Sequence, residues 1–207
     1  MAKRDERELL QRWQAGDAEA GNELVIRHFD AVRLFFLNAV SDREREDLLQ
    51  ETFKRVVAAV GTFEGRSSFR TFLFVIARRT LYDHLRQRYR GKGQFDEMTH
   101  SVVDQGASPS HLVTQIESHR RLLQCLRGLP VQTKELLELY YWQDMTGNEL
   151  AEIQGIPERT LRSRLGTARK ALRDCFVRCA PAAGDADEPD LEGALRELGE
   201  FFRTGRG

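Results

Sequence analysis

Long apolar runs are absent from this 207-residue chain, whose longest strongly apolar stretch is FLFVIA, residues 72–77. A membrane-spanning helix needs about 18 apolar residues, and the opening MAKRDERE has no apolar signal core. Cysteine is also scarce, and its odd number of three disfavours a framework of disulfide bonds. These absences predict a cytoplasmic protein that has no membrane partner.

Signatures of catalysis are missing too. The five histidines have no metal-ligand spacing, and the chain has no paired carboxylates, glycine-rich phosphate loop or nucleophile elbow. Cys175 and Cys179 suit one helix face as a redox or metal pair, but no third or fourth ligand accompanies them at a suitable spacing. We therefore expect a protein that is not an enzyme and that holds no cofactor and no metal ion.

Net charge is zero, because 32 basic residues balance 32 acidic ones, but the charges are segregated along the chain. Asp83 is the only acid in the basic segment 66–92. Glu158 is the only acid in the basic segment 158–173, and residues 181–207 are acidic. Two separate basic segments suit two contact points on one nucleic acid.

Strand patterns are nearly absent and apolar residues recur at helical spacing, which predicts an all-α fold. A stretch with few large apolar residues indicates a flexible linker between two small helical domains. We assign the first domain to residues 1–92, the linker to 93–112, the second domain to 113–180 and an acidic C-terminal extension to 181–207. Within the extension, residues 191–202 have the spacing of a short amphipathic helix.

Capping residues predict several helix boundaries. Asp17 suits the start of one helix, and either Ser41 or Asp42 suits the start of the next. A further helix is expected from about Phe69 to Arg88. It is apolar almost all round at first, which is typical of a central buried helix, and then becomes basic.

The most informative stretch is TGNELAEIQGIPERTLRSRL, residues 146–165, which predicts two short helices joined by a tight turn. Thr146 and Glu149 fit a capping box. Gly155 suits the left-handed conformation that ends a helix, and Pro157 suits the start of the next. A helix–turn–helix with arginines on its second helix favours DNA binding, but a plain helical hairpin with a solvated charged face fits the motif equally well.

Two longer segments resemble regions of a known family. Residues 42–90, which begin DREREDLLQETF, resemble the second conserved region of bacterial sigma factors of the extracytoplasmic-function type. Residues 126–176, which begin LRGLPVQTKELLELYYW, resemble the fourth region of the same factors. The order of the two segments and the linker between them also match. The resemblance implies a factor that binds core RNA polymerase and directs promoter recognition and transcription initiation.

The resemblance implies that the helix opening the first segment docks on the clamp helices of the large polymerase subunit. An acidic and amide face beside leucine suits a basic partner helix. The candidate polymerase-binding residues are Asp47, Leu48, Gln50 and Glu51.

A second group is expected to contact the minus-ten element of promoter DNA. In the family, the loop before the long basic helix accepts a flipped base, and aromatic and basic side chains there suit the stacking and clamping of exposed bases. The candidates are Arg66, Ser67, Ser68, Arg70, Phe72, Arg78 and Arg79. Phe72 stands where the family often has tryptophan, and a role in the core is an equal alternative for this side chain.

A third group, on the second helix of the helix–turn–helix, is expected to read the minus-35 element. The candidates are Arg159, Thr160, Arg162, Ser163 and Arg164. Arginine pairs bidentately with guanine in the major groove, so we expect Arg159 and Arg162 at base edges, with Ser163 beside them. Arg169 and Lys170 are expected to contact phosphate or water.

Three questions stay open at this stage. A helix–turn–helix regulator that acts without entering the polymerase needs only the second segment. Many factors of this type are held by an anti-sigma protein, and nothing in the sequence identifies one. The acidic extension opposes the basic segments in charge, so one hypothesis places residues 191–202 on a basic DNA-binding surface or on a partner. The alternative is a loosely ordered tail.

Overall fold

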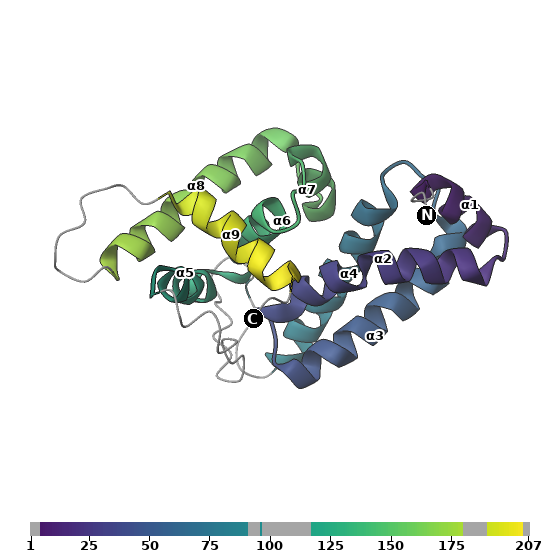
Figure 1. Ribbon diagram of the computed structural model, residues 1–207, viewed down its shortest axis with the longest axis horizontal. Coiled ribbons are helices and arrows are strands. Elements are labelled where there is room, and N and C mark those ends of the chain that lie inside the picture. Colours follow the sequence, from purple (N-terminus) through teal and green to yellow (C-terminus); the bar gives the residue numbers. More distant parts are fainter. Residues whose placement is uncertain (1–4, 91–95, 97–116, 180–189, 205–207) are drawn as a thin grey trace.

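The computed structural model describes residues 5–90, 96, 117–179 and 190–204, and every regular element within these ranges is a helix. The all-α prediction is therefore confirmed. The elements in chain order are α1 (Glu6–Gln14), α2 (Ala18–Leu37), α3 (Asp42–Ala59), the 3₁₀ turn η1 (Val60–Thr62), α4 (Phe69–Arg88), α5 (Glu117–Gly128), α6 (Val131–Tyr141), α7 (Gly147–Gln154), α8 (Glu158–Arg178) and α9 (Leu191–Thr204) (Figure 1). The predicted linker at 93–112, apart from Asp96, lies outside the described residues, as do residues 181–189.

Side-chain caps set the helix starts in the first half of the protein, α1–α4. The Asp17 carboxylate accepts hydrogen bonds from two backbone N–H groups of α2, at 3.0 and 3.1 Å. Ser41 and Glu44 form a reciprocal capping box at the start of α3, which decides between Ser41 and Asp42. Each cap satisfies N–H groups that a helix end otherwise leaves unpaired.

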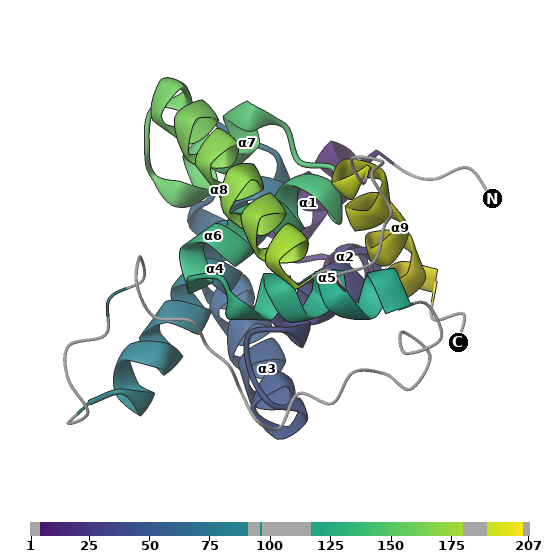
Figure 2. The same ribbon diagram turned by 90° about the vertical axis from the view of Figure 1, so that its left-hand side faces the viewer.

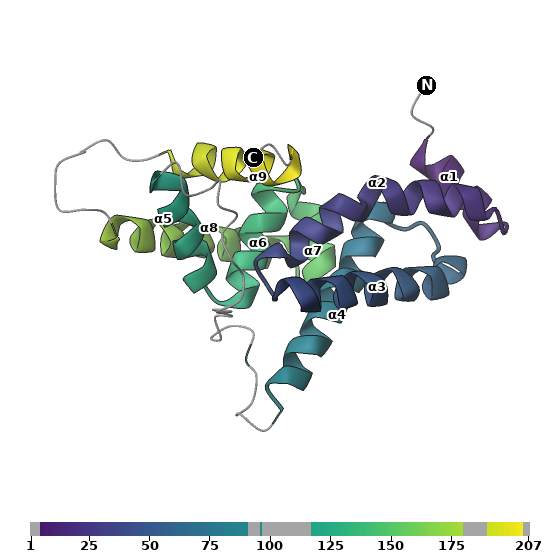
Figure 3. The same ribbon diagram turned by 60° about the horizontal axis from the view of Figure 1, so that its bottom comes forward.

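Helix α4 forms the centre of the first half. Its Leu73, Phe74 and Ala77 are fully buried, and α4 contacts α1, α2 and α3. Phe35 of α2 packs edge-on against Phe74, with ring centroids 5.7 Å apart. Toward its C-terminal end α4 becomes basic and projects from the rest of the molecule (Figure 3). The prediction of a central helix that turns basic is confirmed.

The second half, α5–α9, contains the predicted helix–turn–helix. Thr146 and Glu149 form the capping box of α7. Gly155 ends α7 at a φ of 66°, a left-handed conformation that glycine adopts without a clash of Cβ. Pro157 is the N-cap of α8, whose leucine face is buried. These local predictions are confirmed.

The two halves pack against each other, with α4 against α7 and α2 against α6 and α9. Lys134 Nζ donates to the Asn38 carbonyl oxygen at 2.5 Å, and Asn38 Nδ2 donates to Glu138 Oε1 at 3.0 Å. Arg127 Nε donates to Asn38 Oδ1 at 3.3 Å. The sequence predicts two domains but no interface between them, since Asn38 and Glu138 lie 100 positions apart and leave no local pattern.

Burial at this interface shifts the pKa values of Glu138 and Lys134, and it also lowers the pKa of Arg127. The side chains of Glu138 and Lys134 are 3% and 1% exposed. Burial disfavours a charged form, so it raises the pKa of Glu138 to about 7 and lowers the pKa of Lys134. The contact between the halves therefore contains a carboxyl group that titrates near neutral pH.

One disulfide bond joins two helices of the second half. Cys125 of α5 is bonded to Cys175 of α8, with their Cα atoms 5.7 Å apart. The sequence disfavours a framework of several disulfide bonds and does not indicate this one bond. The pairing escaped the sequence because the two residues lie 50 positions apart. The third cysteine, Cys179, is exposed at the end of α8.

Candidate functional site

The α3 surface that is expected to bind polymerase is partly accessible. Asp47 and Gln50 are exposed, and Glu51 is half-buried beside Arg55, whose Nε lies 2.8 Å from Glu51 Oε1. Leu48 is 5% exposed, so its side chain belongs to the core. The structure thereby corrects the candidate surface, which consists of Asp47, Gln50 and Glu51 without Leu48.

The loop between η1 and α4 is anchored at both ends. Gln14 of α1 donates from Nε2 to the carbonyl oxygens of Val60 and Phe63, at 2.9 and 2.8 Å. At the other end the Ser68 hydroxyl accepts a hydrogen bond from the Thr71 N–H at 3.0 Å and caps α4. The Ser68 hydroxyl, a candidate DNA contact, therefore already serves the start of the helix.

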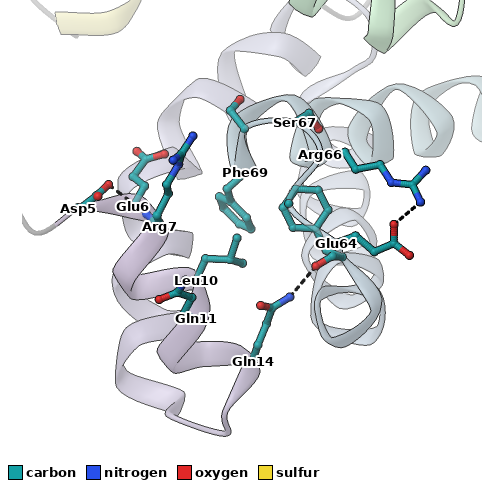
Figure 4. A pocket seen from close by; sticks show the side chains of 13 residues that line it. Asp5, Glu6, Arg7, Leu10, Gln11, Gln14, Glu64, Arg66, Ser67 and Phe69 are labelled. Carbon is teal, nitrogen blue, oxygen red and sulfur yellow. Dashed lines mark hydrogen bonds and ion pairs between the residues drawn. The ribbon is translucent and has the colours of Figure 1, made fainter.

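A pocket of about 810 Å³ lies between this loop and α1 (Figure 4). Arg7 and Gln11 of α1 line one side, and residues 64–69 line the other. Arg66 is 85% exposed and pairs with Glu64 at the rim. The walls are polar and carry both signs of charge, with the acids Asp5, Glu6 and Glu64 beside the two arginines, and a hollow of this size can admit an unstacked base. Sequence reasoning identified the loop but missed α1, since nothing in ERELLQRWQ separates it from an ordinary amphipathic helix.

Phe72 is a packing residue that stays partly accessible. Its ring stacks on Phe63, with centroids 4.4 Å apart, and both side chains are half-buried. Phe72 also lines a second pocket of about 280 Å³, together with Arg66, Ser67 and Glu152 of α7. The ring therefore packs on Phe63, and the part of it that lines the second pocket remains accessible beside the loop.

The basic residues of α4 divide into two groups. Arg79 is exposed. Arg70 donates to the Gln143 carbonyl oxygen, and Arg78 Nε donates to Glu135 Oε1 at 2.9 Å. Burial lowers the pKa of Arg70. Arg70 and Arg78, both expected on minus-ten DNA, thus contact the second half of the protein in this arrangement, which corrects their expected exposure.

The outward face of α8 carries the residues that are expected to read duplex DNA. Its exposed members include Arg159, Thr160 and Ser163, and Arg164 is half-buried. Arg162 is 79% exposed and lies 2.8 Å from Glu158, one helical turn away. An exposed ion pair of this kind contributes little to stability. A DNA base or phosphate can therefore replace Glu158 as the partner of Arg162.

The sequence predicts that Arg169 contacts phosphate or water, but in the structure its side chain is bound within the protein. Its Nε donates to Tyr141 Oη at 2.7 Å and lies 3.4 Å from the Glu192 carboxylate. The guanidinium also lies over the Tyr140 ring, 5.1 Å from the centroid. Arg169 therefore fastens α8 to α6 and α9, whereas Lys170 is exposed.

Helix α9 is packed on the protein, and the prediction of an amphipathic helix at 191–202 is confirmed. Leu191, Leu195 and Leu198 are buried, and α9 contacts α2, α5 and α6 (Figure 1). Its Gly199 lies against Trp142, where an added Cβ would come within 2.6 Å of the indole Cδ1. The alternative of a loosely ordered tail is thus wrong for this helix.

The turn between α6 and α7 joins α4 to α9, which no sequence pattern indicates. The Gln143 carbonyl accepts the hydrogen bond from Arg70 of α4. Asp144, whose φ is 48°, accepts hydrogen bonds from Arg196 and Arg203 of α9, at 3.5 and 3.2 Å. Aspartate tolerates this left-handed conformation better than most residues. The turn immediately before the helix–turn–helix therefore contacts both the first half and the C-terminal helix.

Among the described residues, no helix has the length and apolar character that a membrane span requires. Two family models match the chain in the predicted order. Residues 24–91 match Sigma-70 region 2, and residues 119–172 match Sigma-70, region 4. The first range contains α3 and α4, and the second contains α6, α7 and most of α8.

Solved structures share the fold. The structure of CnrH in complex with the cytosolic domain of CnrY matches with a TM-score of 0.62 at 20% identity, covering 84% of this chain and 99% of that one. The sigma factor RpoE of Bartonella quintana, solved with the anti-sigma factor NepR, matches with a TM-score of 0.58 at 23% identity, covering 77% and 98%. At these identities the likeness concerns the fold alone.

Curated proteins of similar sequence are themselves sigma factors. The RNA polymerase sigma-H factor of Pseudomonas aeruginosa is 28% identical over 182 residues, which are 83% of this chain and 94% of that protein. The ECF RNA polymerase sigma factor SigX of Bacillus subtilis is 32% identical over 150 residues, which are 70% of this chain and 77% of SigX. With both sigma regions matched in order, this chain belongs to the ECF family of RNA polymerase sigma factors.

Proposed function

We propose that this sigma factor binds core RNA polymerase through α3 and brings it to promoters with two separate DNA-reading surfaces. The single observation that carries the proposal is that an acidic helix face and two basic surfaces lie in the two matched sigma regions of one chain. We place the region 2 domain at residues 1–92 and the region 4 domain at 113–180, ranges that contain the matched residues.

The polymerase contact is proposed for Asp47, Gln50 and Glu51. Carboxylate and amide groups on an accessible helix face suit a basic partner surface and make association sensitive to salt. The Glu51–Arg55 pair is exposed enough for a stronger partner to replace it.

Reading of the minus-35 element is proposed for the N-terminal part of α8. Arg159, Arg162 and Ser163 are exposed at the helix start, where backbone N–H groups are also available to phosphate. The minus-ten element is proposed to meet the loop at 64–68 and its pocket, where Arg66 and Ser67 face an unstacked base.

The two DNA-reading surfaces differ in accessibility, and we propose that the structure is a closed form of the factor. The α8 arginines are exposed, whereas Arg70 and Arg78 of α4 contact Gln143 and Glu135. Full engagement of minus-ten DNA by α4 therefore requires the two halves to separate. Helix α9 supports the closed form, because it packs on α2 of the first half as well as on α5 and α6.

Several further assignments belong to the same proposal. A sigma factor works beside polymerase in the cytoplasm and has no catalytic step of its own. The similar structures of CnrH and RpoE hold anti-sigma partners, and a partner of this kind would act here by covering the α3 or α4 surface.

Transcription from a library of promoter templates with purified core polymerase tests the proposal. Arg159→Ala and Arg162→Ala should each relax selection at one base pair, at a cost of about 1–3 kcal/mol per contact. Lys170→Ala is the matched control on the same helix and should weaken binding evenly across sequences. Unchanged promoter selection by the first two variants would contradict the assignment.

The same transcription assay distinguishes the proposed initiation role from the competing role of a DNA-binding regulator. A regulator that acts without entering the polymerase would bind promoter DNA but yield no run-off transcript with core enzyme. That outcome would replace the proposed initiation role with the regulator.

A further inference from the structure

All three cysteines of the chain meet at one place. Cys125 lies on α5, Cys175 lies in the last turn of α8, and Cys179 is the C-cap of α8. Their sulfur atoms all lie within 4.8 Å of one another. Figure 2 shows α5 next to the C-terminal end of α8, and the two helices are in contact. The fold thus supplies the third thiol that the spacing of Cys175 and Cys179 lacks.

We infer that Cys125, Cys175 and Cys179 form a thiol–disulfide relay that reacts with hydroperoxides, with Cys179 as the attacking thiol. The inference goes beyond promoter reading and does not depend on it, because the relay is a chemical property of the α5–α8 pair.

Accessibility assigns the roles of the three sulfurs. Cys179 is exposed, Cys175 is half-buried and Cys125 is 2% exposed. A reagent from solvent therefore meets Cys179 first, and the oxidation has to pass inward. The inner pair, Cys125 and Cys175, has a Cα–Cα distance of 5.7 Å, which suits a disulfide without movement of the backbone.

The surroundings favour a disulfide over a metal ion. Cys125 belongs to the apolar core of the second half, together with Leu122 and Leu126. A disulfide is neutral, whereas three thiolates around a divalent ion place a net negative charge against this core. Among the described residues the cluster contains these three ligands and no fourth, while structural zinc sites are closed by four.

The reaction sequence balances with hydrogen peroxide as the oxidant. The Cys179 thiolate attacks one peroxide oxygen, the O–O bond breaks, and the departing hydroxide takes a proton to become water. The Cys175 thiolate then attacks the resulting sulfenic sulfur, forms the 175–179 disulfide and expels a second hydroxide, which also becomes water. Two thiols and one peroxide have given one disulfide and two waters.

Thiol–disulfide exchange then moves the bond inward. The Cys125 sulfur attacks the Cys175 sulfur, the 175–179 bond breaks, and the proton of Cys125 passes to the departing Cys179. The product is the Cys125–Cys175 disulfide of the structure, with Cys179 again a thiol. This bond ties α5 to the far end of the helix whose start carries Arg159 and Arg162, so the whole DNA-reading unit lies within one covalent loop.

The full-length protein, reduced and freed of reductant, tests the inference when it is treated with one equivalent of hydrogen peroxide and then alkylated. Peptide mass spectrometry should find Cys125 linked to Cys175 and an alkyl group on Cys179. The oxidised protein should also melt at a higher temperature than the reduced protein, because the cross-link restricts the unfolded chain.

Single variants separate the steps. Cys179→Ser changes only an exposed side chain and should slow formation of the inner disulfide about tenfold or more, since the half-buried Cys175 is then the first thiol to react. In Cys125→Ser, oxidation should stop at a disulfide between Cys175 and Cys179. The melting temperature of this variant should then not rise on oxidation. Circular dichroism of the reduced variants checks that each one folds.

Three results would overturn the relay. One is formation of the inner disulfide in Cys179→Ser at the wild-type rate. Another is alkylation of all three cysteines after peroxide treatment. The third is one equivalent of zinc bound to the reduced protein with all three thiols protected, which would make the cluster a metal site. None of these readouts involves transcription, so a failure of the relay is distinct from a failure of the proposed function.

Discussion

Glu51 is the residue at which the polymerase contact is most directly tested. Glu51→Lys reverses the charge at the centre of the accessible α3 face and should weaken core binding by about 1–3 kcal/mol, since like charges at an interface repel. Retention of the variant on immobilised core polymerase, measured at several salt concentrations, checks this. The Glu51–Arg55 pair is only half-buried, so the variant should fold normally.

Glu8→Lys is the matched control for this substitution. Glu8 is also exposed and acidic but lies on α1, away from the α3 face. Equal retention of Glu51→Lys and the wild-type protein would remove α3 from the polymerase interface.

At the scale of single helices, most of what the sequence predicts depends on interactions between residues that are close in the chain. Capping groups such as Ser41, Thr146 and Gly155 act within three or four residues, so their patterns are visible in the chain. The identity of the buried face is equally local. The partner of a face is not local. Leu48 is a separate exception, because the resemblance places it on the polymerase-binding surface whereas its side chain lies on the buried face of α3.

Helix α9 is a single element whose removal should open the closed form. A chain that ends at Cys179 loses the three leucines that α9 buries and the ion pairs to Asp144. The closed form should lose stability, and binding of single-stranded minus-ten DNA should rise about tenfold, as expected for a shift of about 1.4 kcal/mol. Fluorescence anisotropy with a labelled oligonucleotide measures this, and a chain that ends at Thr204 is the control.

A point substitution tests the same contact without a deletion. Gly199→Val places a Cβ about where the Trp142 indole lies and should displace α9. Glu200→Val adds the same side chain at the neighbouring exposed position and should change nothing. If truncation and Gly199→Val both leave oligonucleotide binding unchanged, α9 does not hold the factor closed.

At the scale of the whole molecule, the contact between the halves decides which functional residues are accessible. Arg70 lies 73 positions from Gln143, and Arg78 lies 57 positions from Glu135. No local pattern encodes such pairs, so the sequence identifies Arg70 and Arg78 as basic residues of α4 but not their partners. The pocket wall contributed by α1 escaped prediction for the same reason.

The interface also makes stability depend on pH. The pKa of Glu138 is raised from 4.5 to about 7 by burial, among Lys134, Arg127 and Glu135. The folded protein therefore holds a proton that the unfolded chain has lost between these pH values. Stability falls as pH rises through this window, by an amount on the order of 3 kcal/mol, since one pKa unit corresponds to about 1.4 kcal/mol.

Urea unfolding of the wild-type protein and of Glu138→Gln across pH 4.5–7.5 measures this effect. The variant keeps a hydrogen-bonding side chain but cannot ionise, so its stability should fall less steeply with pH. Glu152→Gln, at an exposed position of α7, should follow the wild-type curve. Parallel curves for wild type and Glu138→Gln would contradict the raised pKa.

The contact between Trp142 and α9 has an optical consequence. The chain has two tryptophans, and Trp142 is 1% exposed, with its ring against Phe202 at 5.3 Å. Departure of α9 would bring this indole into water, so its emission would move to longer wavelength and become open to iodide quenching. With Trp13 of α1 replaced by phenylalanine, the protein would report its own opening in real time, without a dye, while polymerase or DNA is added.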